Sequence, residues 1–213
     1  MNTPSHAIVN CALLGRLRGV RAGWILAFSV LPDLPILLFY LQEKLLARAP
    51  EAQIWNHDYF ISAWQPVIDA LHSFPLIALA LVLLWRWPTL RAAAAAMLLH
   101  SLGDFPLHHD DAHRHFFPFS DWRFRSPLSY WDPAHHGLLG ATVEIALVLA
   151  ALAVLARRSG LNAEKTVGAS RRLQAVRWCY GLTALLYLAL YAIILRHHCA
   201  SPLFHPRLFF CGR

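Results

Sequence analysis

Charged side chains are scarce in this sequence, and their scarcity argues against an ordinary soluble domain. Only 15% of the 213 residues are Asp, Glu, Lys or Arg, whereas soluble domains average about 25%. Hydrophobic residues make up 57% of the chain. This balance is typical of polytopic membrane proteins, and we treat residues 1–213 as a single membrane-embedded domain.

Cysteine is also sparse, and the signatures of several common enzyme classes are missing. The four cysteines form no CxxC pair, which excludes the usual zinc-finger and thioredoxin patterns. The chain contains no GxSxG, no HExxH and no phosphate-binding P-loop. Serine-hydrolase, zincin and P-loop chemistry therefore have no support in the sequence.

Long apolar runs are what the sequence does contain. They cover 23–41, 67–85, 89–107, 137–156 and 178–195, close to the roughly 17–25 residues that cross a bilayer as a helix. The run at 4–14 is too short to cross alone and predicts a half-helix. We therefore expect an all-α, polytopic membrane helix bundle with about five spanning helices plus a short N-terminal half-helix.

The basic residues gather in loops that would share one side of this bundle. If consecutive loops alternate between sides, 16–21, 86–91 and 157–177 lie together, and Glu164 is their only acidic residue. The positive-inside rule makes 157–177 a basic cytoplasmic loop. The net charge of +7 then reports how the chain is oriented in the membrane. The expected partner is membrane lipid, and no nucleic-acid partner is needed to explain the charge. The opposite side carries 108–136, an outer loop rich in His and Asp.

Several ionisable residues interrupt the apolar runs at a similar predicted depth. Such groups are costly in lipid, so they normally face an interior cavity, pair with one another, or mark function. His100 and Asp104 lie four residues apart on one helical face, and Asp69 and His72 lie three apart. The full set is His6, Asp33, Asp69, His72, His100, Asp104 and Glu144. Imidazole and carboxylate groups from several helices build metal centres in bundles, and this set suits zinc, manganese or iron.

Each of these residues also has a structural interpretation without a metal. A single buried histidine is commonly a hydrogen-bonded core residue, and Asp33 between two prolines could cap a broken helix. His100 with Asp104 could be a structural pair, and Glu144 could join two helices. The shared depth and sidedness of the set favour a metal site.

Five short motifs occur in an order that resembles a known family. They are "SHAIVNCALLG" at 5–15, "LPDLP" at 31–35, "ALHSF" at 70–74, "LLHSLGDFPL" at 98–107 and "WRFRSPL" at 122–128. Their order is similar to that in the membrane-bound metal-dependent hydrolases, which include the bacterial inner-membrane hydrolase described as LexA-binding. The resemblance covers residues 5–130 and implies a divalent-metal-dependent hydrolase of the bacterial inner membrane. The charge pattern turns its histidine-rich site toward the periplasm.

By their position in these motifs, the resemblance implies roles for particular residues. Arg123 and Arg125 match a basic pair that would hold an anionic substrate group, with snorkelling at the membrane interface as the alternative. The chain departs from the family pattern at Pro35, which replaces the second Asp of PDxD, and at "VIDAL", which replaces most of HRGxT. The implied metal ligands are His6, Asp33, His72, His100 and Asp104.

The stretch "HHDDAHRH" at 108–115 adds metal-capable side chains that the family pattern lacks. His108 and His109 are candidate ligands there, in a loop that would complete or gate the site; a surface loop that only collects metal is the alternative. For hydrolysis we expect a metal-activated water, with Asp69 or Asp111 as general base and Arg123 or Arg125 stabilising the developing anion. The expected substrate is an amphiphilic, lipid-like compound or phosphoester near the headgroup layer.

Two other classes of function stay open. A non-catalytic metal-binding membrane scaffold or sensor would need the same ligands. A metal or proton transporter would need a polar path to both faces, and the inner halves of the predicted spans contain almost no ionisable residues. A soluble helical bundle with an unusually apolar core is the structural alternative.

Overall fold

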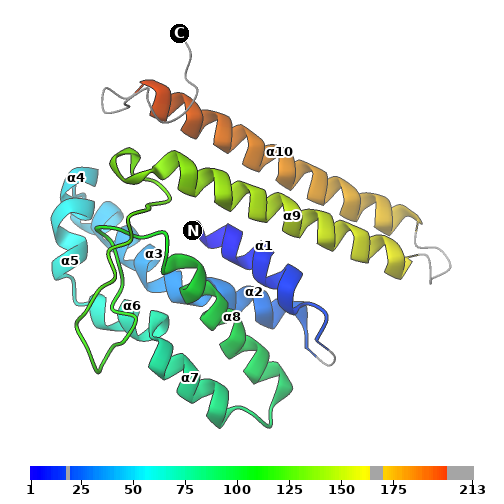
Figure 1. The fold of residues 1–213 in the computed structure, drawn as a ribbon, viewed down its shortest axis with the longest axis horizontal. Helices are drawn as coiled ribbons and strands as arrows, with labels where there is room; N and C mark the ends of the chain where they lie inside the picture. Colours follow the sequence, from blue (N-terminus) through cyan, green and yellow to red (C-terminus); the bar gives the residue numbers. More distant parts are fainter. Residues whose placement is uncertain (18–19, 164–169, 201–213) are drawn as a thin grey trace.

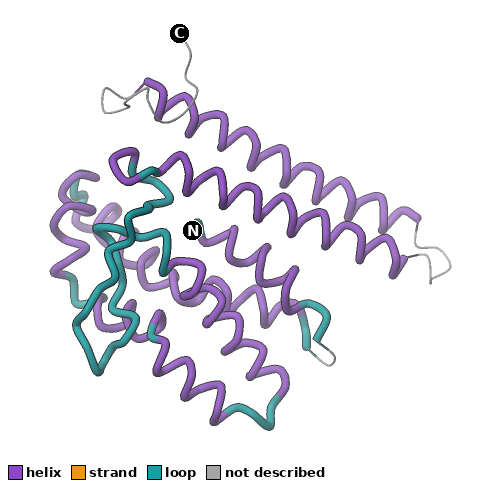
Figure 2. The backbone as a smooth tube through the Cα atoms, in the orientation of Figure 1, coloured by secondary structure: helices purple, strands orange, loops and turns teal. Residues whose placement is uncertain are grey.

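The described chain consists of helices and the loops that join them (Figure 2). The computed structural model describes residues 1–17, 20–163 and 170–200, and these ranges contain no strand. The prediction of an all-α fold is therefore confirmed for this part of the chain.

Helix α1 (Thr3–Leu14) occupies a central place in the bundle (Figure 1). It packs against α2 (Ala22–Val30), α8 (Pro88–Asp104) and α9 (Gly137–Ala163). With 12 residues it is about 18 Å long, too short to cross a bilayer. The predicted N-terminal half-helix is thus present, and it carries His6 into the middle of the molecule.

Helices α9 and α10 (Ser170–Ala200) run antiparallel along one side of the molecule (Figure 1). Tyr187 of α10 packs with Ile145, Val148 and Leu152 of α9 in a buried cluster. Leucines on the rest of the α10 surface, such as Leu182 and Leu185, are exposed. An apolar surface of this kind suits contact with lipid.

The second apolar run does not form one regular helix. Its parts are α2, a 3-10 turn at η1 (Leu31–Asp33), α3 (Leu34–Leu41) and a π-helical turn at η2 (Gln42–Ala47). Proline at 32 and 35 explains the break, because proline has no N–H to donate to the helical ladder. The break leaves Asp33 in the 3-10 turn between the two helices.

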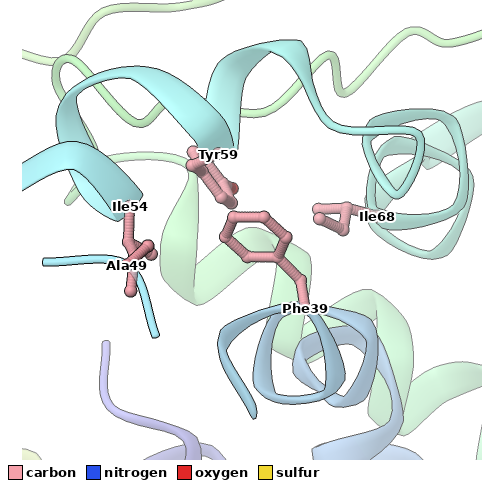
Figure 3. Close-up of a cluster of buried hydrophobic side chains, with 5 residues drawn as sticks. All are labelled: Phe39, Ala49, Ile54, Tyr59 and Ile68. Carbon is pink, nitrogen blue, oxygen red and sulfur yellow. The ribbon is translucent and has the colours of Figure 1, made fainter. Parts of the chain in front are cut away.

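Short helical turns follow α3 and fold back onto it. They are α4 (Glu51–Gln53), a π-helical turn at η3 (Ile54–Asp58) and α5 (Tyr59–Ile61). Figure 3 shows the Phe39 ring between Tyr59 of α5 and Ile68 of the next helix, with Ala49 and Ile54 completing the cluster. These buried contacts hold the short turns against α3 and α6 at one end of the molecule.

Helices α6 (Gln65–His72) and α7 (Phe74–Leu83) form a bent pair, with an angle of 56° between them. Pro75 lies in the first turn of α7, and the Ser73 side chain caps this helix by accepting a hydrogen bond from the Leu76 N–H. The bend places His72 at the end of α6, facing the interior, where it is fully buried.

The prediction of about five spanning helices was too high for the described residues. Three helical stretches are long and apolar enough to cross a membrane, namely Ala22–Ala47, Gly137–Ser159 and Trp178–Arg196. The count rises to four if the bent pair α6–α7 is one span. The run at 89–107 is not among them: α8 ends at Asp104 and has 17 residues, which is the lower limit for a span. Its alanines at 92, 93, 94 and 96 are buried, so α8 is a core helix.

The loop from Phe105 to Asp132 lies at one end of the helices, beside α4 and α5 (Figure 1). The C-terminal ends of α1, α7 and α9 lie at the other end, away from this loop (Figure 1). The basic loops predicted from the sequence therefore begin at the end of the bundle opposite the His/Asp-rich loop. Most of 157–177 lies outside the part whose side chains the structure describes.

Candidate metal centre

Asp33 enters the site because the helix breaks at η1. In an uninterrupted α-helix, the Ser29 carbonyl would accept a hydrogen bond from the N–H of residue 33. In the 3-10 turn the bonds run to the third preceding residue instead, and the Ser29 carbonyl accepts from the Nδ1 atom of His100 at 2.7 Å. The same break thus presents a carboxylate and orients an imidazole beside it.

His100 and Asp104 come from the last turn of α8, where i,i+4 spacing places them on one face. The His100 Nε2 atom lies 3.0 Å from Oδ2 of Asp104 and 3.3 Å from Oδ1 of Asp33. Both α8 side chains are buried. The prediction from spacing therefore places this pair correctly within the interior of the bundle.

His72 completes a group of four. Its Nδ1 atom donates to the Ile68 carbonyl at 2.8 Å, one turn back in α6. Its Nε2 atom lies 3.7 Å from Oδ1 of Asp33 and 3.7 Å from Oδ2 of Asp104. One ligand atom from each of Asp33, His72, His100 and Asp104 lies within 4.8 Å of the other three.

The hydrogen bonding of the two imidazoles fits a cation between them. A carbonyl only accepts hydrogen bonds, so His72 and His100 both carry a proton on Nδ1. Their Nε2 atoms are buried and make no hydrogen bond. Both Nε2 atoms face carboxylate oxygens, and either a second ring proton or a shared cation makes that arrangement favourable.

The spacing of these atoms agrees with the same interpretation. Ligand atoms about 2.0–2.2 Å from one tetrahedral ion lie roughly 3.3–3.6 Å apart. The imidazole-to-carboxylate distances in the group run from 3.0 to 3.7 Å. Two imidazoles and two carboxylates therefore form a donor set and a spacing suited to a divalent ion.

The N-terminal residues meet the other oxygen of Asp104. Oδ1 of Asp104 lies 2.9 Å from Nε2 of His6 and accepts from the α-amino nitrogen of Met1 at 2.6 Å. The His6 ring stacks on His100 with 3.8 Å between centroids. His6 lies next to the four-residue group but is not a member of it.

Glu144 of α9 forms hydrogen bonds with the start of helix α1 and is not one of the potential metal ligands. Its Oε1 atom accepts hydrogen bonds from the Asn2 backbone and side chain and from the Ser5 hydroxyl. A carboxylate at a helix N-terminus is favoured by the unpaired N–H groups there. Glu144 thereby holds the first turn of α1, and with it His6, against Asp104.

A second potential ligand group involves the outer loop. It consists of Asp104, His108 and His113, whose ligand atoms also lie within 4.8 Å of one another. The His113 ring stacks on His72 with 3.9 Å between centroids. The sequence placed His113 in a His-rich loop but did not single it out, because nothing in the local spacing indicates which loop histidines turn inward.

Burial and neighbouring charges give the loop residues different protonation behaviour. Burial acts to lower the pKa of His108, but the carboxylates of Asp104 and Asp111 outweigh it and raise that pKa to about 9. Burial also acts to raise the pKa of Asp111, but His108 lowers it below its ordinary value. Burial, together with His72 and His108, holds the pKa of His113 well below its ordinary value, so the His113 ring is neutral at neutral pH.

His109 lies apart from both groups. Its ring stacks on His135 with 3.5 Å between centroids, and its Nδ1 atom hydrogen-bonds to the Ser126 carbonyl. His135 in turn binds Asp132 through Nδ1 at 2.6 Å. These contacts hold together the two ends of the loop, and the structure does not bring His109 to Asp104.

Asp69 is fully buried and is engaged by arginine. It accepts from the Arg114 backbone N–H at 2.9 Å and from the Arg114 Nε at 2.6 Å. Arg123 lies 3.8 Å from the same carboxylate and also donates to the Ala112 carbonyl. Asp69 and Arg123 therefore anchor the outer loop to α6, whereas the exposed Arg125 lies on a cavity wall.

The cavity in question has a volume of about 990 Å³ and meets both ligand groups. Asp33, His108 and His113 form part of its wall, together with Asp111 and Arg125. Much of the remaining wall is aromatic or aliphatic, contributed by Ile36, Leu37, Tyr40, Trp55, Tyr59, Phe60, Tyr130 and Trp131. A chamber of this size and lining suits an amphiphilic molecule with a polar group at the histidines.

Comparison with known proteins adds no relative: no family model, no curated protein and no solved structure matches this chain. The resemblance to membrane-bound metal-dependent hydrolases stays a prediction from short motifs. The functional assignment therefore depends on the geometry of the His/Asp cluster and the cavity beside it.

Proposed function

We propose that the protein is a membrane-embedded hydrolase that uses a divalent cation to cleave an amphiphilic phosphoester. One observation carries this proposal: the group of Asp33, His72, His100 and Asp104 is buried except for the partly exposed Asp33, and through Asp33 it adjoins a cavity of about 990 Å³. An ion that only stabilises the fold needs no cavity of this size beside it. A catalytic ion needs such a cavity, because the substrate has to reach the metal ligands.

Zinc is the cation that we propose first. Two imidazoles and two carboxylates without thiolate suit zinc, and manganese or iron would also accept them. When bound, such an ion lowers the pKa of a coordinated water toward about 7 and so supplies a nucleophile. Asp33, His72, His100 and Asp104 would hold the ion.

The other residues of the cavity have separate tasks. Asp111 lies on the cavity wall, 2.9 Å from Nδ1 of His108, and is placed to accept the proton of the attacking water. Arg125 on the same wall would hold the phosphate group of the substrate. We assign the general-base role to Asp111 and not to Asp69, because Asp69 is occupied by Arg114.

The aromatic part of the cavity would hold the hydrocarbon portion of the substrate. Trp55, Tyr59 and Phe60 line it and belong to the short turns that pack on α3. The arrangement places apolar and ionic recognition in one chamber, as a lipid-like phosphoester requires. We propose a bacterial inner membrane, which the family resemblance implies, with this chamber on the periplasmic side, which the charge distribution of the loops favours.

The test is metal content and turnover of the detergent-purified protein compared with a His100→Gln/Asp104→Asn double variant. We expect at least one zinc, manganese or iron per chain in the parent protein, and loss of the ion in the variant. Hydrolysis of a short-chain phospholipid or a chromogenic phosphodiester should fall by about 100-fold or more. The matched control is His57→Gln, since His57 is exposed on η3 and belongs to neither ligand group.

Two outcomes would overturn the proposal. Undiminished turnover in the double variant would show that the cluster is not catalytic. Bound metal without turnover on any phosphoester would favour a metal-binding scaffold or sensor instead.

A further inference from the structure

Asp104 faces potential ligands through both of its carboxylate oxygens. Oδ2 lies 3.0 Å from Nε2 of His100 and 3.7 Å from Nε2 of His72. Oδ1 lies 3.3 Å from Nε2 of His108, a residue of the outer loop. The two ligand groups found among the described residues therefore meet at a single carboxylate.

The loop histidines are buried and have unpaired nitrogen atoms. His113 is 2% exposed and His108 7%. The Nδ1 atom of His113 and the Nε2 atom of His108 make no hydrogen bond. Buried imidazole nitrogens normally find a partner, and these two lie in one ligand group with Asp104.

A neighbouring carboxylate orients one of these rings. Oδ2 of Asp111 lies at ion-pair distance, 2.9 Å, from Nδ1 of His108, and the Nε2 atom of the same ring lies 3.3 Å from Oδ1 of Asp104. A carboxylate on the far nitrogen of an imidazole is the usual support of a metal-binding histidine. Asp111 itself is supported by the indole N–H of Trp131 at 3.3 Å.

We propose that the protein binds a second divalent cation at Asp104, His108 and His113, and that Asp104 bridges it to the first. This inference rests on the proposed function, because the first cation occupies the group of Asp33, His72, His100 and Asp104. Ions in two-metal sites lie about 3.5–4 Å apart. The two oxygens of one carboxylate can serve such a pair.

The position of the second site matches the class of substrate. His108 and His113 line the same cavity as Asp33, so both groups contribute ligands to one chamber wall. Paired cations stabilise the attacking and leaving oxygens of a phosphoester during displacement. The other contacts of Oδ1, from Met1 and His6, come from the α1 side, whereas His108 and His113 come from the outer loop.

The experiment is metal stoichiometry after equilibration of the detergent-purified protein with zinc, and separately with manganese. We expect two ions per chain in the parent protein and one in His113→Gln, which keeps the first group intact. The matched control is His109→Gln, a histidine of the same loop outside both groups, which should keep two. Retention of one ion in His113→Gln also shows that the variant is folded around the first site.

Electron paramagnetic resonance of the manganese-loaded protein gives an independent measure. A bridged pair shows a spin-coupled spectrum, and we expect His113→Gln to show an isolated Mn²⁺ signal instead. One ion per chain in the parent protein, with no coupling, would overturn the second site alone. No bound ion in the parent protein would overturn the proposed function together with it.

Discussion

Asp69 and Asp104 are both buried carboxylates near histidines, but they are neutralised differently. Asp69 accepts two hydrogen bonds from Arg114 and lies near Arg123. Asp104 has imidazoles and the α-amino nitrogen of Met1 around it. A guanidinium satisfies a carboxylate through a fixed pair of donors, whereas imidazole lone pairs leave room for a cation. The kind of side chain that surrounds each carboxylate therefore distinguishes Asp69, which anchors the loop, from Asp104, which is a candidate metal ligand.

We expect Asp69→Asn to lower the free energy of unfolding by about 3 kcal/mol, because it removes the fully buried charge that pairs with Arg114 and Arg123. Metal content should not change. Thermal unfolding in detergent, with parallel metal analysis, measures both. Asp121→Asn is the matched control: Asp121 binds the same Arg114 at 2.6 Å but is 89% exposed, so its loss should cost less than about 1 kcal/mol. Loss of the metal in Asp69→Asn would contradict the anchoring role.

Two elements determine whether the outer loop reaches the site, namely α8, which it leaves, and α9, onto which it folds. The Tyr130 N–H donates to the Leu107 carbonyl, and the Ser129 N–H donates to the His135 carbonyl. Gly140 in the first turns of α9 lies directly beneath this segment. A Cβ atom there would be 2.6 Å from the Ser129 carbonyl oxygen and 2.9 Å from the Tyr130 Cα, so the close approach requires glycine.

We expect Gly140→Ala to destabilise the protein by about 1–3 kcal/mol, since the neighbouring backbone has to move to admit the methyl group. The loop should also become more susceptible to protease. Gly181→Ala in α10 is the control, because an added Cβ meets nothing within 4 Å and alanine favours a helix by about 1 kcal/mol. Thermal unfolding and limited proteolysis in detergent compare the two variants. Equal unfolding temperatures for the two would count against close packing of the loop on α9.

The whole molecule combines an apolar exterior with a polar interior. Side chains on α10 such as Leu182, Leu186 and Ile193 are exposed, while His72, His100 and Asp104 are buried. Both the exposed apolar surface and the buried His/Asp cluster are unusual for a soluble protein. This distribution is consistent with the three helical stretches of the described residues that are long and apolar enough to span a membrane.

We expect the protein to stay in the membrane fraction after washes with high salt and alkaline carbonate, and to be released by detergent. The reason is that lipid covers the apolar surface of the spanning helices, which salt and pH do not weaken. Immunoblotting of the soluble and membrane fractions measures the distribution. A peripheral protein washed in parallel should be released by carbonate, and release of this chain under the same conditions would point to a soluble bundle.

Sequence patterns were sufficient where the deciding contacts are local. Composition and apolar runs predicted an all-α chain with helices long and apolar enough to span a membrane, because helical periodicity and apolar length act along one segment. They did not distinguish α8 from a span. Its length is close to the limit, and what excludes it is the early end at Asp104 and the packing of its alanines inside the bundle.

The candidate site divides in the same way. The i,i+4 spacing of His100 and Asp104 places them on one face of α8 whatever surrounds the helix, so the sequence alone established that pair. Only the tertiary structure decided that Asp33 and His72 join this pair. It also decided that Asp69 is bound to Arg114. In the outer loop, it decided that His113 turns inward while His109 stacks on His135. These outcomes depend on helix breaks and on the path of a loop of nearly thirty residues between α8 and η4. Long-range packing determines both the helix breaks and the path of the loop, and the spacing of residues along the chain does not predict that packing.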